Sequence, residues 1–116
     1  MSTRPANNRI TRKTTYQTVV VDTATIGNCT EIDYREFAGG GVVIPTSSAI
    51  TVLNWYGRTE ADSTYYALYD DVGAALAQAV TSAKGYPIPD ACFGWAYLKI
   101  ISTGGDGESI YVSLKG

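Results

Sequence analysis

The amino-acid sequence predicts an all-β protein, a jelly-roll-like antiparallel β-sandwich that carries an extended N-terminal arm. From residue 16 onward, short runs of β-branched and aromatic residues alternate with Gly, Pro, Asn and Asp, which is typical of many short antiparallel strands. Before residue 16 the chain is polar and basic and has neither a helical nor a strand period. The chain therefore divides into an arm, residues 1–15, and a β-sandwich domain, residues 16–116.

The arm differs from the rest of the chain in its charge. Its first 13 residues hold four of the nine basic side chains and no acidic one, so the remainder carries five basic against eleven acidic groups, a net charge of −6. The four cations are Arg4, Arg9, Arg12 and Lys13. A short basic segment without an apolar pattern cannot bury enough surface to fold by itself. We therefore expect the arm to dock on a surface outside its own domain.

Three roles are open to these four cations: docking on an acidic protein surface, contact with nucleic-acid phosphates, or no contact in a free tail. Docking is favoured, because charge-assisted contacts with the acidic surface of another protein or of a neighbouring copy would order the arm. Contact with nucleic acid is the least favoured, because no aromatic residue lies between the cations.

The first strand is predicted at residues 16–25, where β-branched residues dominate, and a turn follows at residues 26–28. Further strands are predicted at residues 29–34, 41–44, 49–57, 64–69, 85–88, 96–101 and 109–114, and further turns at residues 60–63, 70–73 and 104–107. In the segment 49–57 the side chains alternate between two faces. One face holds Ile50, Val52, Asn54 and Tyr56, and the other holds Thr51, Leu53 and Trp55.

Residues 70–85 are compatible with either a helix or a strand. A helix would start at an aspartate N-cap, place apolar residues four apart and end before Gly85, and the alanines favour it. A strand would span residues 74–80, with Leu76, Gln78 and Val80 on one face, and would follow a hairpin turn. The local pattern alone leaves the two alternatives nearly equal.

Several classes of function are disfavoured by what the sequence lacks. It contains no histidine, which removes the commonest general base and metal ligand, so we expect no enzymatic activity. Cys29 and Cys92 lack the Cys-x-x-Cys spacing of a zinc site, and two reduced, buried thiols are favoured, although the sequence does not exclude a disulfide. No segment approaches the roughly 20 apolar residues of a membrane span, and the N-terminus lacks the apolar core of a signal peptide.

Three polar motifs offer only incomplete ligand sites. Gly39-Gly40-Gly41 precedes an apolar strand without a following Gly-Lys-Ser/Thr, so a turn is expected rather than a phosphate loop. Asp70-Asp71 and Asp106-Gly107-Glu108 have too few oxygen ligands for a calcium loop, and both are interpreted as acidic turns. We therefore expect no metal and no cofactor.

Aromatic residues supply a candidate contact surface in the domain. The chain has nine tyrosines and two tryptophans, and amphipathic aromatics are enriched at interfaces. Tyr65, Tyr66 and Tyr69 fall on both faces of one predicted strand, so at least one ring should point away from the core. Trp55 and Trp95 are interpreted as core residues. An exposed tyrosine patch would favour contact with a protein neighbour, with stacking on a glycan as the alternative.

Several motifs follow one another in order along the domain. They are GGVVIP at residues 40–45, ITVLNWYG at 50–57, YYALYDD at 65–71, YPIP at 86–89, FG at 93–94, YLKIIS at 97–102 and IYVSLK at 110–115. In order and spacing they resemble small structural proteins encoded in the head gene clusters of tailed phages. The resemblance covers residues 27–116 and leaves the arm outside. It implies a β-sandwich that decorates or cements a virion, with no catalytic residues and a strand at residues 74–80.

On this basis we expect a virion structural protein on the surface of a phage capsid, made in the host cytoplasm. It would bridge neighbouring shell subunits, with the arm as a tether. Its partners would be the major capsid protein and copies of itself, in a homotrimer or another symmetric assembly, and no membrane. The alternative is a carbohydrate- or host-surface-binding module displayed on the virion, because β-sandwiches host both roles.

Overall fold

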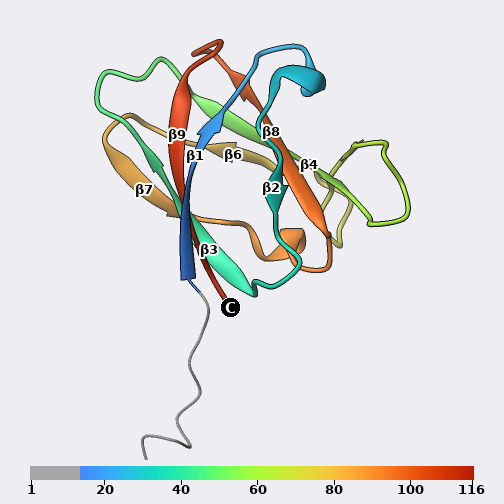
Figure 1. Ribbon diagram of the computed structural model, residues 1–116. Helices are drawn as coiled ribbons and strands as arrows, with labels where there is room; N and C mark the ends of the chain where they lie inside the picture. Colours follow the sequence, from blue (N-terminus) through green and yellow to red (C-terminus); the bar gives the residue numbers. More distant parts are fainter. Residues whose placement is uncertain (1–13) are drawn as a thin grey trace, which may run out of the picture.

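Two antiparallel β-sheets pack face to face in the computed structural model, which describes residues 14–116 (Figure 1). The first, sheet A, contains in spatial order β1 (Thr14–Val20), β9 (Ser109–Lys115), β3 (Gly39–Ile44) and β7 (Lys84–Pro87). The second, sheet B, contains β2 (Ile32–Asp33), β8 (Tyr97–Thr103), β4 (Val52–Arg58) and β5 (Tyr66–Ala67), and β6 (Ala77–Ala79) also pairs with β4. Two short 3-10 turns, η2 (Ile26–Asn28) and η3 (Asp90–Cys92), lie in the connections. The predicted all-β sandwich is confirmed.

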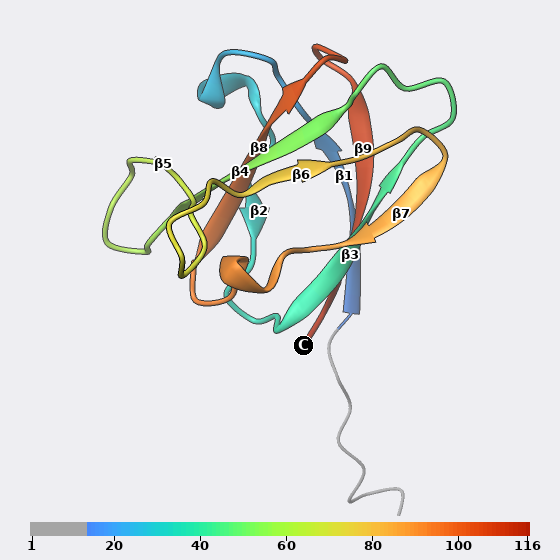
Figure 2. The same ribbon diagram turned by 180° about the vertical axis from the view of Figure 1, so that it is seen from behind.

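The strand order is that of a jelly roll. Strands β5 and β6 follow one another along the same edge of β4, where Tyr56 is opposite Ala67 and Leu53 is opposite Gln78 (Figure 2). They act as one interrupted strand. When β5 and β6 are counted as one strand, that strand follows β4 in the same sheet, and every other pair of consecutive strands lies in different sheets. The first strand lies beside the last. Eight strands wound in this way form the two Greek keys of a double-sheet jelly roll.

The ambiguous segment after Asp70 forms a strand and not a helix. A small hairpin, closed by a bridge between Tyr69 and Ala75, leads into β6. Val80 then donates its backbone N–H to Thr51 and is buried, whereas the alanines of β6 are exposed. Helix propensity is overridden because part of the edge of β4 would otherwise remain unpaired. The strand alternative is therefore confirmed.

The first strand begins earlier than predicted and crosses between the sheets. It starts at Thr14, two residues before the expected start, because Thr14 pairs with Lys115 at the end of β9. Thr14 and Thr15, which were expected in the arm, therefore belong to the domain, and the arm is residues 1–13. The strand ends at Val20, and Asp22 then forms a parallel bridge to Ile101 of sheet B. Strands that switch sheets make the corners of a sandwich, so this crossing ties the two layers together.

The prediction of a turn is wrong for Gly39 and Gly40, because β3 begins at Gly39, whereas Gly41 lies in the strand predicted at residues 41–44. The three glycines pair with the end of β9, where Gly40 lies opposite Leu114. A Cβ on Gly40 would collide with the backbone oxygen of Ser113, so the two strands approach more closely than a side chain allows. The glycine is needed for close backbone approach rather than for chain reversal.

The core lies between the sheets and is built from the inward side chains of the strands and their flanks. Its largest fully buried members are Trp55, Ile32, Ile44, Ile50, Leu53, Leu98, Ile100, Ile110, Leu114, Val19, Val21 and Val42. Cys29 and Cys92 are free, buried thiols, as the sequence favours. Burial raises the pKa of Cys92 to about 12, so this thiol is protonated at neutral pH. Trp95 packs against the core and is partly buried.

The two ends of the described chain lie side by side. Thr14 at the start of β1 is opposite Lys115 at the end of β9, and both lie at the same end of the sandwich (Figure 1). The arm is therefore joined to the domain at one end of sheet A. Its four cations fall outside the described residues. They are Arg4, Arg9, Arg12 and Lys13.

Candidate functional site

The outward surface of sheet A carries three large exposed side chains on neighbouring strands. Tyr16 of β1 is 82% exposed, Tyr111 of β9 is 52% exposed and Val43 of β3 is 49% exposed. Val43 lies directly opposite Tyr111. Tyr16 lies opposite Ser113, two residues along β9 from Tyr111, so Tyr16 and Tyr111 are diagonal neighbours. Side chains so placed are within contact range of one another. We call this surface the apolar face.

A groove runs along the apolar face, and no charged side chain lines it. The groove has a volume of about 260 Å³ and is lined by Tyr16, Gln17, Thr18, Val43, Tyr111, Val112 and Ser113. Gly41 is on the same face of β3 as Val43, and Gly85 lies opposite Val43 on β7. Because both are glycines, no side chain at either position covers Val43. Exposed aromatics with few charged neighbours are typical of the centre of a protein interface.

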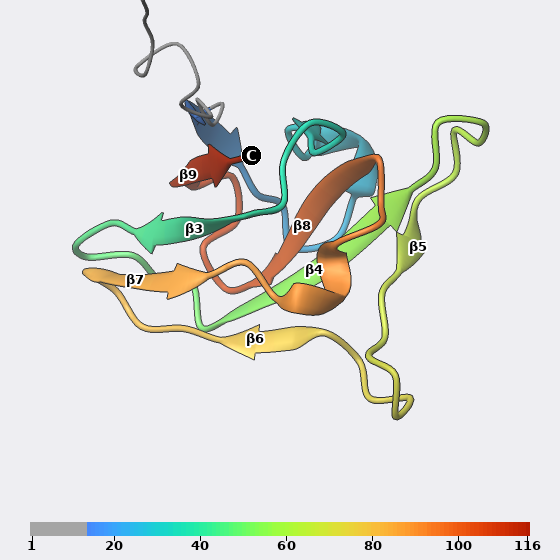
Figure 3. The same cartoon turned by 90° about the horizontal axis from the view of Figure 1, so that it is seen from below.

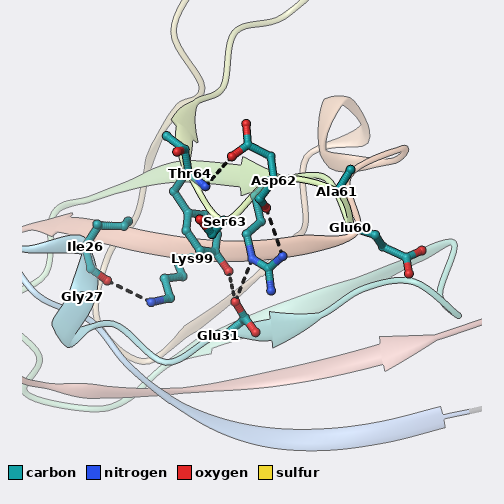
Figure 4. A pocket seen from close by; sticks show the side chains of 11 residues that line it. Ile26, Gly27, Glu31, Glu60, Ala61, Asp62, Ser63, Thr64 and Lys99 are labelled. Atoms are coloured by element: carbon teal, nitrogen blue, oxygen red, sulfur yellow. Dashed lines mark hydrogen bonds and ion pairs between the residues drawn. The ribbon is translucent and has the colours of Figure 1, made fainter.

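A wider cleft lies on the outward surface of sheet B (Figure 4). Its volume is about 740 Å³, and it lies between η2 and the loop that joins β4 to β5. It is lined by Ile26, Gly27, Glu31, Arg58, Glu60, Ala61, Asp62, Ser63, Thr64, Tyr65 and Lys99. The loop between β4 and β5 projects away from the two sheets (Figure 3). The cleft therefore has a floor of residues that lie in strands or next to them, and a wall formed by a loop.

One carboxylate organises the floor of the cleft. Oε2 of Glu31 accepts a hydrogen bond from the Tyr65 hydroxyl at 2.5 Å and another from Arg58 Nε at 3.1 Å. Partial burial opposes ionisation, but the hydrogen bonds from Tyr65 and Arg58 outweigh it and lower the pKa of Glu31. Burial, together with the hydrogen bond to Glu31, raises the pKa of Tyr65. At neutral pH the floor therefore holds an ionised carboxylate and a neutral phenol.

Arg58 also fixes the loop that forms the wall of the cleft. Its Nη1 donates to the backbone oxygens of Thr59 at 3.1 Å and Asp62 at 3.2 Å. Its guanidinium lies over the Tyr97 ring, 3.9 Å from the centroid, and the Arg35 guanidinium lies 5.0 Å from the same centroid. Stacking of this kind holds a cation in place on the sheet. The wall is thus fixed by the same side chain that orients the floor.

Lys99 supplies a second cation on the floor. Its Nζ donates to the backbone oxygen of Ile26 at 3.2 Å and lies 5.0 Å from the centroid of the Tyr65 ring. No carboxylate of the described chain forms an ion pair with Lys99. Because an ammonium group has three donors, Lys99 can donate to a bound molecule while it keeps its contact with Ile26.

The three tyrosines expected to form a contact surface have different surroundings. Tyr66 and Tyr69 are exposed, so the expectation that at least one ring points away from the core is confirmed. Tyr65 is half-buried and lines the cleft, with its hydroxyl bound to Glu31. The Tyr66 hydroxyl instead donates to Asp62 at 2.9 Å. Of the three, only Tyr65 belongs to the cleft.

The sequence does not single out Glu31, Arg58 or Lys99 as site residues. They are far apart in the chain and come together because β8 pairs with both β2 and β4. A partial signal exists in the predicted strand 96–101, where Tyr97 and Lys99 alternate with apolar residues. That alternation indicates a solvent-facing side but does not identify its partners.

The acidic turns hold neighbouring loops in place. Asp106 accepts hydrogen bonds from the backbone and the hydroxyl of Thr23, while Glu108 accepts them from the Ser48 hydroxyl and the Ala49 backbone. Within residues 14–116, no group of three or more His, Cys, Asp or Glu side chains is arranged to hold a metal ion. In that same range, no helix is long and apolar enough to cross a membrane.

The Glu31 contacts predict a pH dependence of stability. The pKa of Glu31 is lowered from its ordinary value of 4.5, so its contribution is complete above that value and is lost as the pH falls through the lower folded value. Because the side chain is 39% exposed, the contribution should be under about 1 kcal/mol. In urea unfolding between about pH 7 and about pH 3, the free energy of unfolding should therefore fall more for the parent than for Glu31→Gln as the pH is lowered. Identical pH profiles would contradict the stabilising role of this carboxylate.

The comparisons with known proteins give no match. No protein family, curated protein or solved structure matches the chain.

Proposed function

We propose that the protein is a virion structural protein that decorates or cements a phage capsid. It bridges neighbouring shell subunits at the capsid surface, and the N-terminal arm tethers it there. One observation carries the proposal: the apolar face, with Tyr16 and Tyr111 exposed, shares β1 and β9 with Thr14, where the basic arm joins the domain. The motif resemblance to phage head proteins supports the same role.

The arm and the apolar face could together form one interface, with the face as its apolar centre and the arm as its charged part. The face can exclude water without removing a charge from solvent, which is how the centre of an interface gains affinity. The four arm cations can form charge-assisted hydrogen bonds with an acidic shell surface and speed the encounter. Because the arm leaves the domain from β1, which also carries Tyr16, both parts can reach the same neighbouring protein.

Bound in this way, the protein would stabilise a shell mechanically. Each copy that contacts two shell subunits adds interface that must be broken before the shell opens. Because capsids present rotational symmetry axes, bound copies would form a symmetric assembly, such as a homotrimer at a threefold axis. The proposed partners are the major capsid protein and other copies of this chain.

Co-sedimentation with purified capsids that lack the protein tests this proposal. The parent should bind, and deletion of residues 1–13, which leaves β1 intact, should weaken binding at least about tenfold. Tyr16→Ser should also weaken it at least about tenfold, because an interfacial aromatic is truncated. Capsids that carry the parent protein should release their genome at a higher temperature than capsids that lack the protein.

The control is Tyr66→Ser, which removes an exposed tyrosine from sheet B. Circular dichroism should show that all three variants keep the β-sheet spectrum of the parent. The control should bind capsids as the parent does. Unchanged binding after both the deletion and Tyr16→Ser, or no binding by the parent, would overturn the proposed docking.

A further inference from the structure

We infer that the cleft on the outward surface of sheet B binds a neutral saccharide. This site is separate from the apolar face and would give the protein a second partner, beyond capsid docking. The cleft brings together an ionised carboxylate, two cations and a phenol, which lie in the paired strands of sheet B or directly next to them (Figure 4). The relevant side chains are Glu31, Arg58, Tyr65 and Lys99.

The floor offers both acceptors and donors at short range. Sugar hydroxyls donate and accept hydrogen bonds, so they need both kinds of partner side by side. Glu31 uses Oε2 for its two hydrogen bonds, and no described residue donates to its second oxygen, Oε1. Lys99 uses one donor for Ile26 and can direct the others to a ligand. A hydroxyl pair on one sugar ring could therefore engage Glu31 and Lys99 together.

The floor is also held in its binding arrangement before any ligand arrives. Glu31 is fixed by Tyr65 and Arg58, and Arg58 fixes the loop wall through the carbonyls of Thr59 and Asp62. Ordering of side chains and loops is one of the main costs of binding. A preformed set of polar groups lowers that cost, which matters for a ligand with little apolar surface.

The charge of the cleft favours a neutral ligand over an ionic one. The lining holds three carboxylates and two cations, a balance of two minus three, or −1, and Arg35 outside the lining pairs with Glu60 at 3.5 Å, which brings the balance to zero. They are Glu31, Glu60 and Asp62 against Arg58 and Lys99. A phosphate or sulfate would be repelled by Glu31 and Asp62, and a basic peptide would be repelled by the two cations. An uncharged polyol can pair with both kinds of group without such repulsion.

The mode of contact differs from stacking on an exposed tyrosine. The Tyr65 ring lies within reach of two cations, with Lys99 Nζ 5.0 Å and the Arg58 guanidinium 5.8 Å from its centroid. Those cations compete with a sugar for the ring faces, so the site recognises hydroxyl groups by hydrogen bonding. With a volume of about 740 Å³, the cleft lies within the range of small-molecule sites and can hold more than one sugar ring.

NMR titration of the full chain tests the inference. The probes are methyl glycosides and disaccharides of glucose, galactose, mannose, rhamnose and N-acetylglucosamine, each taken to about 10 mM to detect a Kd near 1 mM. At least one should shift amide signals around Gly27, residues 59–65 and Lys99, and leave those of β1 and β9 unchanged. Lys99→Met, which removes the donors but keeps an unbranched side chain only one atom shorter, should weaken that binding at least about fivefold.

Lys84→Met, on β7 and outside the cleft, is the matched control and should bind as the parent does. Thermal unfolding should confirm that both variants are folded. Absence of cleft shifts with every probe, or equal binding by Lys99→Met and the parent, would overturn the inference. Loss of capsid binding in Lys99→Met without any saccharide binding would also overturn it and identify the cleft as a protein contact. The capsid result for Tyr16→Ser is independent of these outcomes.

Discussion

Replacing Gly40 with alanine is expected to lower the free energy of unfolding by about 3 kcal/mol or more, a large share of the stability of a small domain. The new Cβ would collide with the backbone oxygen of Ser113 and lie 3.1 Å from the Cα of Leu114. Both neighbours are backbone atoms, so no side chain can rotate away to relieve the collision. Strands β3 and β9, the central pair of sheet A, would have to separate.

Gly39→Ala is the matched control for this substitution. It lies in the same run, but its added Cβ would have no atom within 4 Å. Urea unfolding followed by circular dichroism should place its stability within about 0.5 kcal/mol of the parent. If the two variants were equally stable, the close approach of β3 and β9 would be contradicted. Insoluble Gly40→Ala beside soluble Gly39→Ala would support it.

The run Gly39-Gly40-Gly41 shows which features of the fold can be predicted from neighbouring residues in the sequence. Runs of β-branched residues bounded by turn residues predict the strands, and the strand expected at 109–114 matches β9 to within one residue. The need for Gly40 arises instead from Ser113, which lies far along the chain and meets it only through strand pairing. Composition alone cannot distinguish a glycine in a strand from one in a turn.

The candidate surfaces depend even more strongly on strand order. Tyr16 and Tyr111 occupy outward positions in strands that the sequence predicts, but their adjacency follows from the pairing of the first strand with the last. Glu31 and Lys99 are similarly brought together by the pairing of β2 with β8. Local periodicity assigns each side chain to a face, whereas the jelly-roll winding decides its neighbours.

Replacing Trp55 with alanine is expected to cost about 4 kcal/mol and to lower the melting temperature by roughly 15 °C or more. The Trp55 side chain is 1% exposed and belongs to the core between the sheets. Its indole N–H donates to Gln78 Oε1 at 3.1 Å, and Gln78 Nε2 donates to the Pro87 backbone oxygen at 2.9 Å. The substitution would therefore leave a cavity and break a link from sheet B to β7 of sheet A.

Trp55→Phe separates these two effects. It keeps most of the buried ring and loses only the N–H donor, and because Gln78 is partly exposed, water can replace that donor. The expected cost is about 1 to 2 kcal/mol. Tyr69→Ala, at an exposed ring, should stay within about 0.5 kcal/mol of the parent. Equal losses for Trp55→Ala and Trp55→Phe would assign the stability to the hydrogen bond to Gln78 rather than to ring burial. A loss below about 1 kcal/mol for Trp55→Ala would contradict its place in the core.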